Sequence, residues 1–290
     1  MRIELLGTGG ASATPRPTCD CHVCAQARAR GVPYSRNGPA VFVHGPDLLI
    51  DTPEDIIHSL NRANIRRVAA ATFSHWHPDH TAGCRVFESL NHLARVWPRA
   101  NVPTPVFIPR QVKDDFDRWL GLSEQMDYLE NALQVVRQQV VPDGESFTVD
   151  GVTVTPFKLP VHTANVYAFI LTEGSKRVLV VPDETFGWQP DPALGHFNLV
   201  VMPMGLLEFD PFSGERLISA DHSLLTVEAT FRQTLDMIRL LDTERTVLVH
   251  IEEFDQVSYD DLLQLQRKVK ADRPELGSVM FGFDRLALSV

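Results

Sequence analysis

The run His75-Trp76-His77-Pro78-Asp79-His80 contains four side chains of the kinds that bind metal ions. The apolar stretch 68–73 precedes it, and the segment 85–94 that follows has a helical pattern. The run is therefore predicted to form a loop between a strand and a helix, where protein scaffolds present functional side chains. His75 and His77 point the same way from an extended backbone, while Asp79 and His80 continue around a turn.

Two pairs of ligands in this order can hold two metal ions. Imidazole combined with carboxylate suits Zn²⁺, Mn²⁺ or Fe²⁺, whereas Ca²⁺ prefers oxygen ligands alone. The choice among the three metals stays open, because all of them accept the same side chains. The alternative is a polar loop whose histidines face water, but three histidines and an aspartate rarely fall in this order by coincidence.

The His-x-His-x-Asp-His pattern resembles that of the metallo-β-lactamase superfamily of binuclear hydrolases. That family adds an aspartate after an early strand, a single histidine, a bridging aspartate and a final histidine, each at a strand end. Apolar runs precede all four matching positions, as sites built from strand ends require, and these positions are Asp51, His162, Asp183 and His250. The resemblance implies one metal bound by His75, His77 and His162, a second bound by Asp79, His80 and His250, and Asp183 bridging them.

The elements that must position these residues form two β-rich halves. Strands are expected at 40–44, 47–51 and 106–108, densely over 147–181, and at 246–249, 279–281 and 286–288; helices are expected over about 54–63, 85–94, 114–120, 226–241 and 258–270. With helices outside two sheets, the predicted fold class is α/β, a four-layer αβ/βα sandwich. We expect a single domain over 1–290, since ligands from 51 to 250 must converge. The segment 101–139 either covers the site or fills the outer layer.

Two N-terminal features precede these elements. The Gly-rich segment 7–10 predicts a tight turn near the metal site, because it lacks the Lys-Ser/Thr of a phosphate loop. Cys19, Cys21 and Cys24, within a segment of about 15–30, form a compact thiolate cluster suited to a structural Zn²⁺. In a cytoplasmic protein this is favoured over a disulfide. A tetrahedral site needs a fourth ligand, for which His22, Glu252 and Glu253 are candidates; the alternative is three buried thiols without metal.

The cysteine cluster, the Gly-rich turn and the histidine motif together resemble the phosphoribosyl 1,2-cyclic phosphate phosphodiesterases of bacterial phosphonate catabolism, over nearly the whole chain. In that family a histidine three places after the final metal histidine completes the structural zinc site. This chain has Glu253 there, which we take as the fourth ligand. The same resemblance implies that His222 contacts phosphate or acts as a general acid, which its titration range allows. Asp51 is expected to orient a metal ligand without binding the metal itself. Glu184 either does the same or is an acidic residue on the surface.

The function predicted from this set is a binuclear metal-dependent hydrolase, a phosphoric diester hydrolase acting on a small, cyclic phosphodiester. The hypothesis uses a metal-bridging hydroxide as nucleophile, with Asp79 and Asp51 supporting the catalytic centre and His222 assisting the leaving group. One alternative is hydrolysis of another ester, thioester or lactone, because the fold serves many reactions. A second is a non-catalytic binding protein of the quinone-cofactor biosynthesis type. The full ligand set favours an enzyme.

Composition limits the partners. A formal net charge of −10 argues against nucleic acid and anionic membrane surfaces, but leaves open a small anionic substrate held by metal. No apolar run approaches the ~20 residues of a membrane span, and the segment 1–7 lacks the length and apolar core of a signal peptide. A cytoplasmic protein is expected, and a homodimer is a common assembly at this size.

Overall fold

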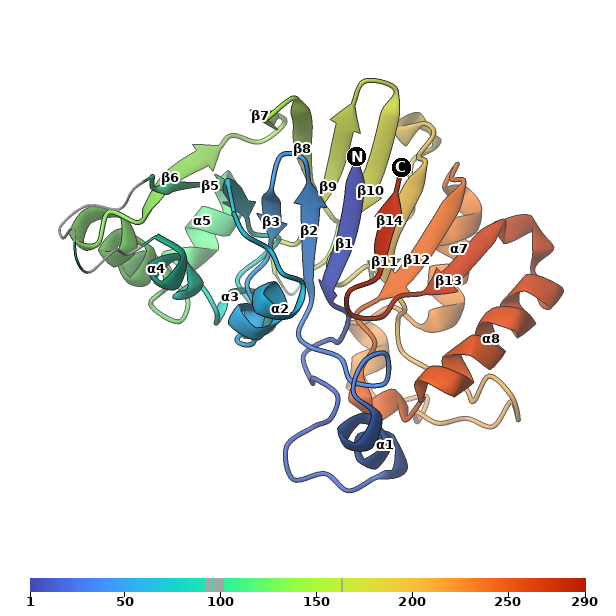
Figure 1. Ribbon diagram of the computed structural model, residues 1–290. Helices are drawn as coiled ribbons and strands as arrows, with labels where there is room; N and C mark the ends of the chain where they lie inside the picture. The colour runs from blue at the N-terminus through green and yellow to red at the C-terminus, as the bar shows by residue number, and fades with distance from the viewer. Residues whose placement is uncertain (92–94, 96–101, 163) are drawn as a thin grey trace.

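A computed structural model of the chain describes residues 1–91, 95, 102–162 and 164–290. Its described part contains two seven-stranded sheets that pack face to face, with helices on both outer surfaces (Figure 1). This arrangement confirms the predicted four-layer αβ/βα sandwich. The two chain ends lie together, since β1 pairs with β14 and Val290 N–H donates to Met1 C=O.

The first sheet has the strand order β14-β1-β2-β3-β4-β5-β6. The pairs β3-β4, β4-β5 and β5-β6 are parallel, while β1 pairs antiparallel with both of its neighbours, β14 and β2. The strands are β1 (Arg2–Gly7), β2 (Ala40–His44), β3 (Leu48–Ile50), β4 (Ala70–Thr72), β5 (Thr104–Pro109), β6 (Val136–Val141) and β14 (Ala287–Ser289).

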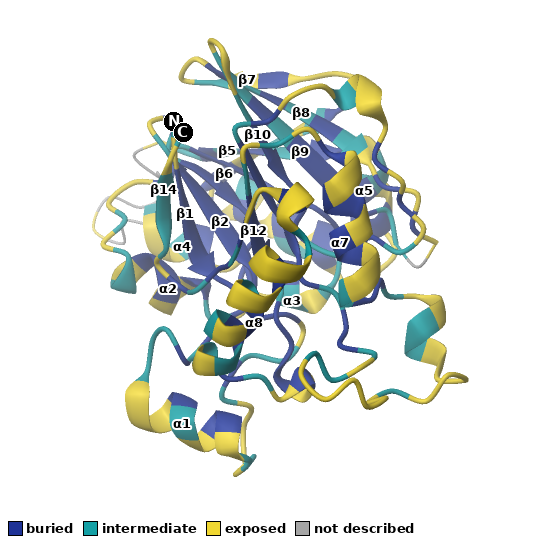
Figure 2. Ribbon diagram, turned by 90° about the vertical axis from the view of Figure 1, so that its right-hand side faces the viewer, coloured by how far each residue is buried: buried dark blue, intermediate teal, exposed yellow. Residues whose placement is uncertain are grey.

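The second sheet has the order β13-β12-β11-β10-β9-β8-β7, with β10 to β13 parallel and the hairpins β7-β8-β9-β10 antiparallel. Strands β3, β4 and β11 are entirely buried, as parallel strands covered on both faces must be. Figure 2 shows that the strands of both sheets are mostly buried, whereas the exposed residues lie mainly on helices and loops. The strands are β7 (Phe147–Val149), β8 (Val152–Lys158), β9 (Tyr167–Glu173), β10 (Lys176–Val180), β11 (Leu199–Pro203), β12 (Arg245–Val249) and β13 (Ser278–Phe281).

Helices cover the outer faces of both sheets (Figure 1). Beside the first sheet lie α2 (Ile56–Arg62), α3 (Pro78–Thr81), α4 (Val86–Asn91), α5 (Arg110–Phe116) and α6 (Leu122–Asp127), followed by a π-helical turn, Tyr128–Ala132. Beside the second lie α7 (Phe231–Leu240) and α8 (Tyr259–Asp272), while α1 (His22–Arg30) projects below both sheets. Short 3₁₀ turns occupy Pro192–Leu194, Ser223–Thr226, Glu253–Asp255 and Pro274–Leu276.

Local capping explains where the helices differ from the predicted ranges. The helix expected over 226–241 begins only at Phe231, because Thr230 and Gln233 form a capping box. The helix expected over 114–120 is α5, which ends before Leu120 and Gly121, both with positive φ. Of the helix expected over 85–94, α4 is described, while 92–94 lie outside the described residues, as does the first residue of the segment 101–139.

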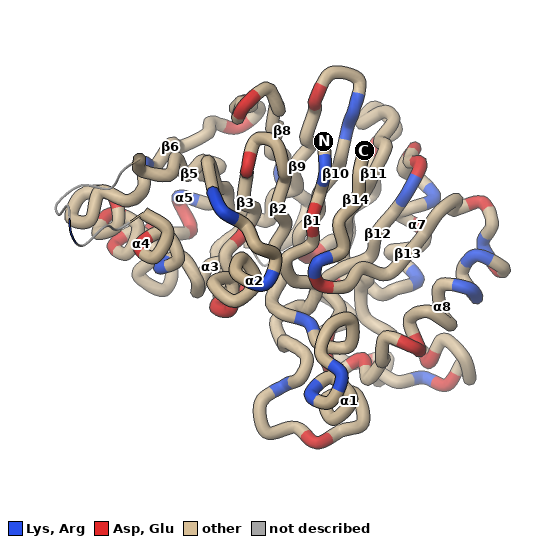
Figure 3. The backbone as a smooth tube through the Cα atoms, in the orientation of Figure 1, with Lys and Arg blue, Asp and Glu red and all other residues tan. Residues whose placement is uncertain are grey.

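Two apolar clusters hold the layers together. One fills the space between the sheets and reaches α2 and α5, and the other lies between the second sheet and the buried faces of α7 and α8. On the solvent side of α8, basic and acidic residues are interspersed (Figure 3). Among the described helices, none is both long and apolar enough to cross a membrane.

Candidate metal centre

The ends of four strands bring the predicted ligands to one place between the sheets. Asp51 follows β3 and His75 follows β4, at the carboxyl ends of parallel strands in the first sheet. Asp183 follows β10 and His250 follows β12, at the corresponding edge of the second. The carboxyl ends of parallel strands are where α/β proteins place their sites. Asp51 (φ 65°) and His250 (φ 52°) adopt left-handed backbone, a strain that accumulates at functional sites.

Two groups of ligand atoms share Asp183. The first consists of His75, His77 and Asp183, and the second of Asp79, His80, Asp183 and His250; within each group the ligand atoms lie within 4.8 Å of one another. Asp183 Oδ2 lies 3.1 Å from His75 Nε2, and Asp183 Oδ1 lies 3.2 Å from His250 Nε2. His80 Nε2 lies 3.3 Å from Asp79 Oδ2.

Four buried atoms of these groups have no hydrogen-bond partner among the described residues. They are the Nε2 atoms of His75, His80 and His250, and Oδ2 of Asp79. Buried polar atoms are almost always paired, because leaving one unpaired costs about 1–3 kcal/mol. Four such atoms, all from candidate ligands and all converging, fit a site built for divalent metal.

The charges of the centre also fit a cation. Burial alone would lower the pKa of His250, but the carboxylates of Asp183 and Asp79 outweigh it and raise that pKa to about 10. Burial acts to raise the pKa of Asp183, yet the imidazoles of His250 and His75 hold it well below its usual range. The carboxylates of the centre thus attract positive charge to His250, and a divalent metal ion bound there would take the place of its proton.

Asp51 lies behind the ligands and connects them. Its carboxylate accepts hydrogen bonds from Ser74 N–H (2.7 Å), from Ser74 Oγ–H (2.7 Å) and from His80 Nδ1 (2.8 Å). Ser74 Oγ also lies 3.0 Å from His75 Nδ1. These contacts direct the Nδ1 atoms of one histidine in each group away from the centre, which leaves both Nε2 atoms for metal.

The Gly-rich segment 7–10 passes beside this centre. A Cβ atom on Gly10 would lie 2.0 Å from Glu252 Oε1 and 2.7 Å from His250 Cε1, so only glycine fits. Glu252 accepts hydrogen bonds from Ala11 N–H (2.9 Å) and Ser12 N–H (3.2 Å). The turn therefore supports the loop that carries His250.

Two predicted site residues stay outside the ligand groups. His162 is exposed and belongs to neither group, so the first group contains two histidines instead of the three that were expected. His222 is also exposed, and its Nδ1 accepts a hydrogen bond from Leu224 N–H (3.1 Å). The roles of both residues stay predictions.

Two glutamates, Glu184 and Glu228, lie directly beside the metal centre, where the sequence left the place of Glu184 open and did not predict Glu228. Glu184 and Glu228 line a small space together with Asp183 and His250. Burial raises the pKa of Glu184 to about 8 and that of Glu228 to about 7. Glu184 also accepts hydrogen bonds from Phe186 N–H and from Ala229 N–H (3.3 Å), so it is not a surface acid. Glu228 belongs to no sequence motif. It lies 45 residues after Asp183, and only the folding of its loop brings the two side chains together.

The three cysteines converge on Glu253. Its Oε1 atom lies 3.4, 3.2 and 3.0 Å from the Sγ atoms of Cys19, Cys21 and Cys24. A tetrahedral Zn²⁺ with Zn–S of ~2.3 Å and Zn–O of ~2.0 Å separates its sulfur and oxygen ligands by about 3.5 Å. The donor set therefore fits a closed Cys₃Glu zinc site, with His22 exposed outside it.

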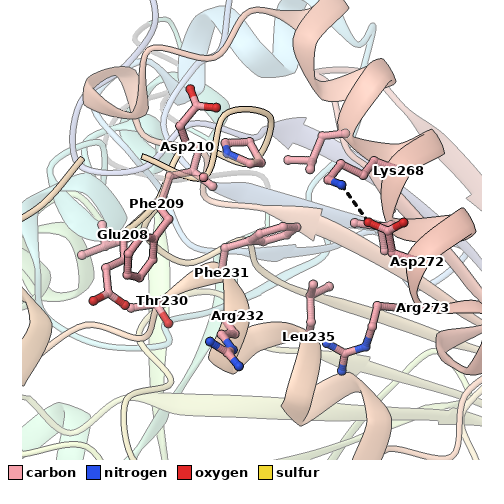
Figure 4. Close-up of a pocket in the computed structure, with 16 residues that line it drawn as sticks. Glu208, Phe209, Asp210, Thr230, Phe231, Arg232, Leu235, Lys268, Asp272 and Arg273 are labelled. Atoms are coloured by element: carbon pink, nitrogen blue, oxygen red, sulfur yellow. Dashed lines mark hydrogen bonds and ion pairs between the residues drawn. The ribbon is translucent and has the colours of Figure 1, made fainter. Parts of the chain in front are cut away.

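A larger cavity, of about 450 Å³, lies away from the metal ligands. It is enclosed by the loop after β11 and by α7 and α8, with Phe231 reaching into it and Lys268 held by Asp272 at 2.8 Å (Figure 4). Among the described residues, no candidate metal ligand lines it, and Leu206 is the one that borders both this cavity and the small space beside Asp183.

Comparison with known proteins identifies the fold. Residues 46–251 match the family described as the beta-lactamase superfamily domain, while no curated protein matches the chain. Among solved structures, a diphosphatase from the PhnP family is similar with a TM-score of 0.70 at 20% identity, covering 99% of this chain and 97% of that one. Zn²⁺-bound PqqB from Methylobacterium extorquens has a TM-score of 0.69 at 18% identity, covering 100% of both chains. The short form of human tRNase Z has a TM-score of 0.63 at 15% identity, covering 100% of this chain and 99% of that one.

Proposed function

Because this chain belongs to the β-lactamase superfamily of metal-dependent hydrolases, we propose that it is a binuclear phosphodiesterase acting on a small, cyclic phosphodiester. The observation that carries the proposal is the convergence of histidine and aspartate side chains in two ligand groups that share the carboxylate of Asp183. A diphosphatase and a tRNase Z, both named for phosphate-linkage cleavage, share the fold. The sequence resemblance to phosphoribosyl cyclic phosphate phosphodiesterases makes that class of substrate the first to test.

The chain's own residues would act as follows. His75 and His77 would hold one metal ion, Asp79, His80 and His250 the other, and Asp183 would contact both. Divalent metals in such a site lower the pKa of water and neutralise phosphoryl oxygens. Asp51 orients the histidines, and Glu228 stands beside Asp183 and His250, where it can give a proton to a departing oxygen.

The test is a substrate panel on metal-stripped protein reconstituted with Mn²⁺, Zn²⁺ or Fe²⁺. We expect metal-dependent hydrolysis of bis(4-nitrophenyl) phosphate and of ribosyl cyclic phosphates, with no hydrolysis of carboxylic ester, thioester or lactone substrates. Cleavage of the acyl substrates alone would overturn the phosphodiesterase proposal in favour of another hydrolase.

A binding protein is the second candidate, and one observation favours it. His162 lies outside the first ligand group, so that group offers fewer protein ligands than the second. PqqB, which shares the fold, binds Zn²⁺. Metal binding at the centre without hydrolysis of any substrate in the panel would support this candidate.

Asp51→Asn is expected to weaken metal binding and lower kcat/KM by about 10- to 100-fold, the usual cost of losing an outer ligand-orienting partner. An amide offers one acceptor atom where the carboxylate serves three donors, and its N–H₂ group faces His80 Nδ1. Chelator competition measures the metal affinity. Ser74→Ala, which keeps the carboxylate, should have a smaller effect, and equal affinity of Asp51→Asn and wild type would contradict this role.

Glu228→Gln is expected to slow only substrates whose leaving group needs a proton. General acids contribute about 10²- to 10⁴-fold, so cleavage to an alkoxide should fall by at least about 10²-fold. Release of 4-nitrophenolate, which leaves without a proton, should change little. His222→Ala is the parallel variant: if it shows this leaving-group dependence and Glu228→Gln does not, then the exposed histidine is the donor.

A further inference from the structure

Two tryptophans form a continuous aromatic surface beside the metal motif. Trp76 lies between the ligands His75 and His77, and its ring meets that of His77 edge-on, with centroids 4.7 Å apart. Trp119, from the turn after α5, stacks on Trp76 with centroids 5.1 Å apart and an interplanar angle of 20°. One residue, Trp76, thus separates Trp119 from the candidate metal ligand His77.

Trp119 leaves much of its ring in solvent. It is 47% exposed, and the neighbouring Leu120 is 63% exposed, whereas Trp188 elsewhere in the chain is buried. Because Trp76 stacks on one face of the Trp119 ring, the opposite face is the one that a ligand could stack on. Neighbouring exposed apolar side chains of this size commonly mark a binding surface.

The turn that presents these side chains is conformationally unfavourable. Leu120 (φ 58°) and Gly121 (φ 64°) both adopt left-handed backbone, and Leu122 N–H donates to Trp119 C=O at 3.2 Å. Left-handed φ suits glycine but is a rare conformation for a residue as bulky as leucine. Such strain is found mainly at functional sites, and the Leu120 side chain is itself exposed, although the turn also leads into the buried Leu122 of α6.

Two basic residues lie near this surface in the sequence: Arg118, directly before Trp119, is exposed, and Lys113 is engaged by its neighbours. Lys113, on α5, donates both to Asp117 and to Ser123 Oγ (2.7 Å), so its ammonium group is already paired. The exposed tryptophan itself offers stacking, which flat rings supply through their π-faces.

We propose that Trp119, supported by Trp76, binds a flat aromatic ring carried by the phosphate ester substrate. The proposal rests on the proposed function for the placement of the phosphate at the metal ligands. Trp76 connects the two parts of the site, since it contacts both Trp119 and His77. Among the phosphodiesters that the metal centre would accept, this surface would favour those with an aromatic or heteroaromatic group, such as a nucleobase.

The test compares two probes that share a sugar phosphate and differ in the ring, AMP and ribose 5-phosphate. Calorimetry on metal-loaded protein should show AMP binding at least about tenfold tighter, the range of stacking on one aromatic side chain. Trp119→Leu should bring this ratio close to one without changing the affinity for ribose 5-phosphate, and Trp119→Phe should restore most of it. Phe212→Leu, which removes an exposed aromatic residue from another loop, should leave the ratio unchanged.

The outcomes separate this proposal from the proposed function. Equal affinities for the two probes in wild type, or a ratio that Trp119→Leu leaves intact, would overturn the ring surface while leaving the phosphate site standing. An AMP preference lost in Trp119→Leu, in a protein that hydrolyses no diester, would support the ring surface and overturn the phosphodiesterase. Failure of both probes to bind would overturn the proposal.

Discussion

Asp183→Asn is expected to reduce kcat/KM for phosphodiester hydrolysis by more than about 100-fold and to leave the centre short of metal. Removing a residue that only orients a metal ligand already lowers metal affinity or activity by about 10- to 100-fold. Asp183 is itself a candidate ligand, and both ligand groups share its carboxylate. Its two oxygens contact His75 and His250 at 3.1 and 3.2 Å, and the isosteric amide retains only one of them as an acceptor. Metal content by mass spectrometry and initial rates on reconstituted protein measure both effects.

The matched control is Asp191→Asn. Asp191 is an exposed aspartate that accepts a hydrogen bond from Ala193 N–H (2.8 Å) at the start of a 3₁₀ turn. It should keep wild-type metal content and activity. An Asp183→Asn protein that retained both metals and wild-type rates would show that the shared carboxylate does not organise the centre.

Cys24→Ala is expected to remove one zinc equivalent and to lower the free energy of unfolding by more than about 3 kcal/mol. Structural zinc supplies roughly 10–16 kcal/mol of apparent binding energy in small domains, and only part of it is needed to hold a segment of a larger fold. Cys19, Cys21 and Cys24 belong to the segment before β2, whereas Glu253 lies just after His250, so the metal would join two distant parts of the chain. Metal analysis and urea unfolding measure the two losses.

Two further variants test the ligand set itself. Cys84→Ala removes a buried cysteine outside the cluster, whose Sγ–H donates to Thr81 C=O, and should keep every zinc equivalent. Glu253→Gln should weaken zinc binding, while Glu253→His, which supplies a nitrogen ligand, should retain it. Wild-type protein with three freely titrating thiols at this cluster and no zinc beyond the catalytic centre would refute the structural site.

Local patterns in the sequence were sufficient for the elements and for most of the centre. The alternation of buried apolar runs with helical patterns predicted the four-layer sandwich, because strands of a parallel sheet must be apolar on both faces. The motif 75–80 was found from its residue types and spacing, whereas Asp51, Asp183 and His250 were implied by the resemblance to the metallo-β-lactamase superfamily and supported by the apolar runs before them. Helix limits were less accurate, since a capping box at Thr230 and positive φ at Leu120 override a periodic pattern.

Contacts between segments far apart in the sequence were decided only by the tertiary structure. Glu252 and Glu253 are adjacent, yet Glu253 faces the cysteines while Glu252 binds the backbone of Ala11 and Ser12, which spacing alone left undecided. Glu228 reaches the centre through the return of a loop, Trp119 reaches Trp76 through the packing of a turn, and His162 ends outside the ligand groups. Sequence periodicity reports which face of an element is buried, whereas the neighbours of a side chain depend on how the two sheets pack.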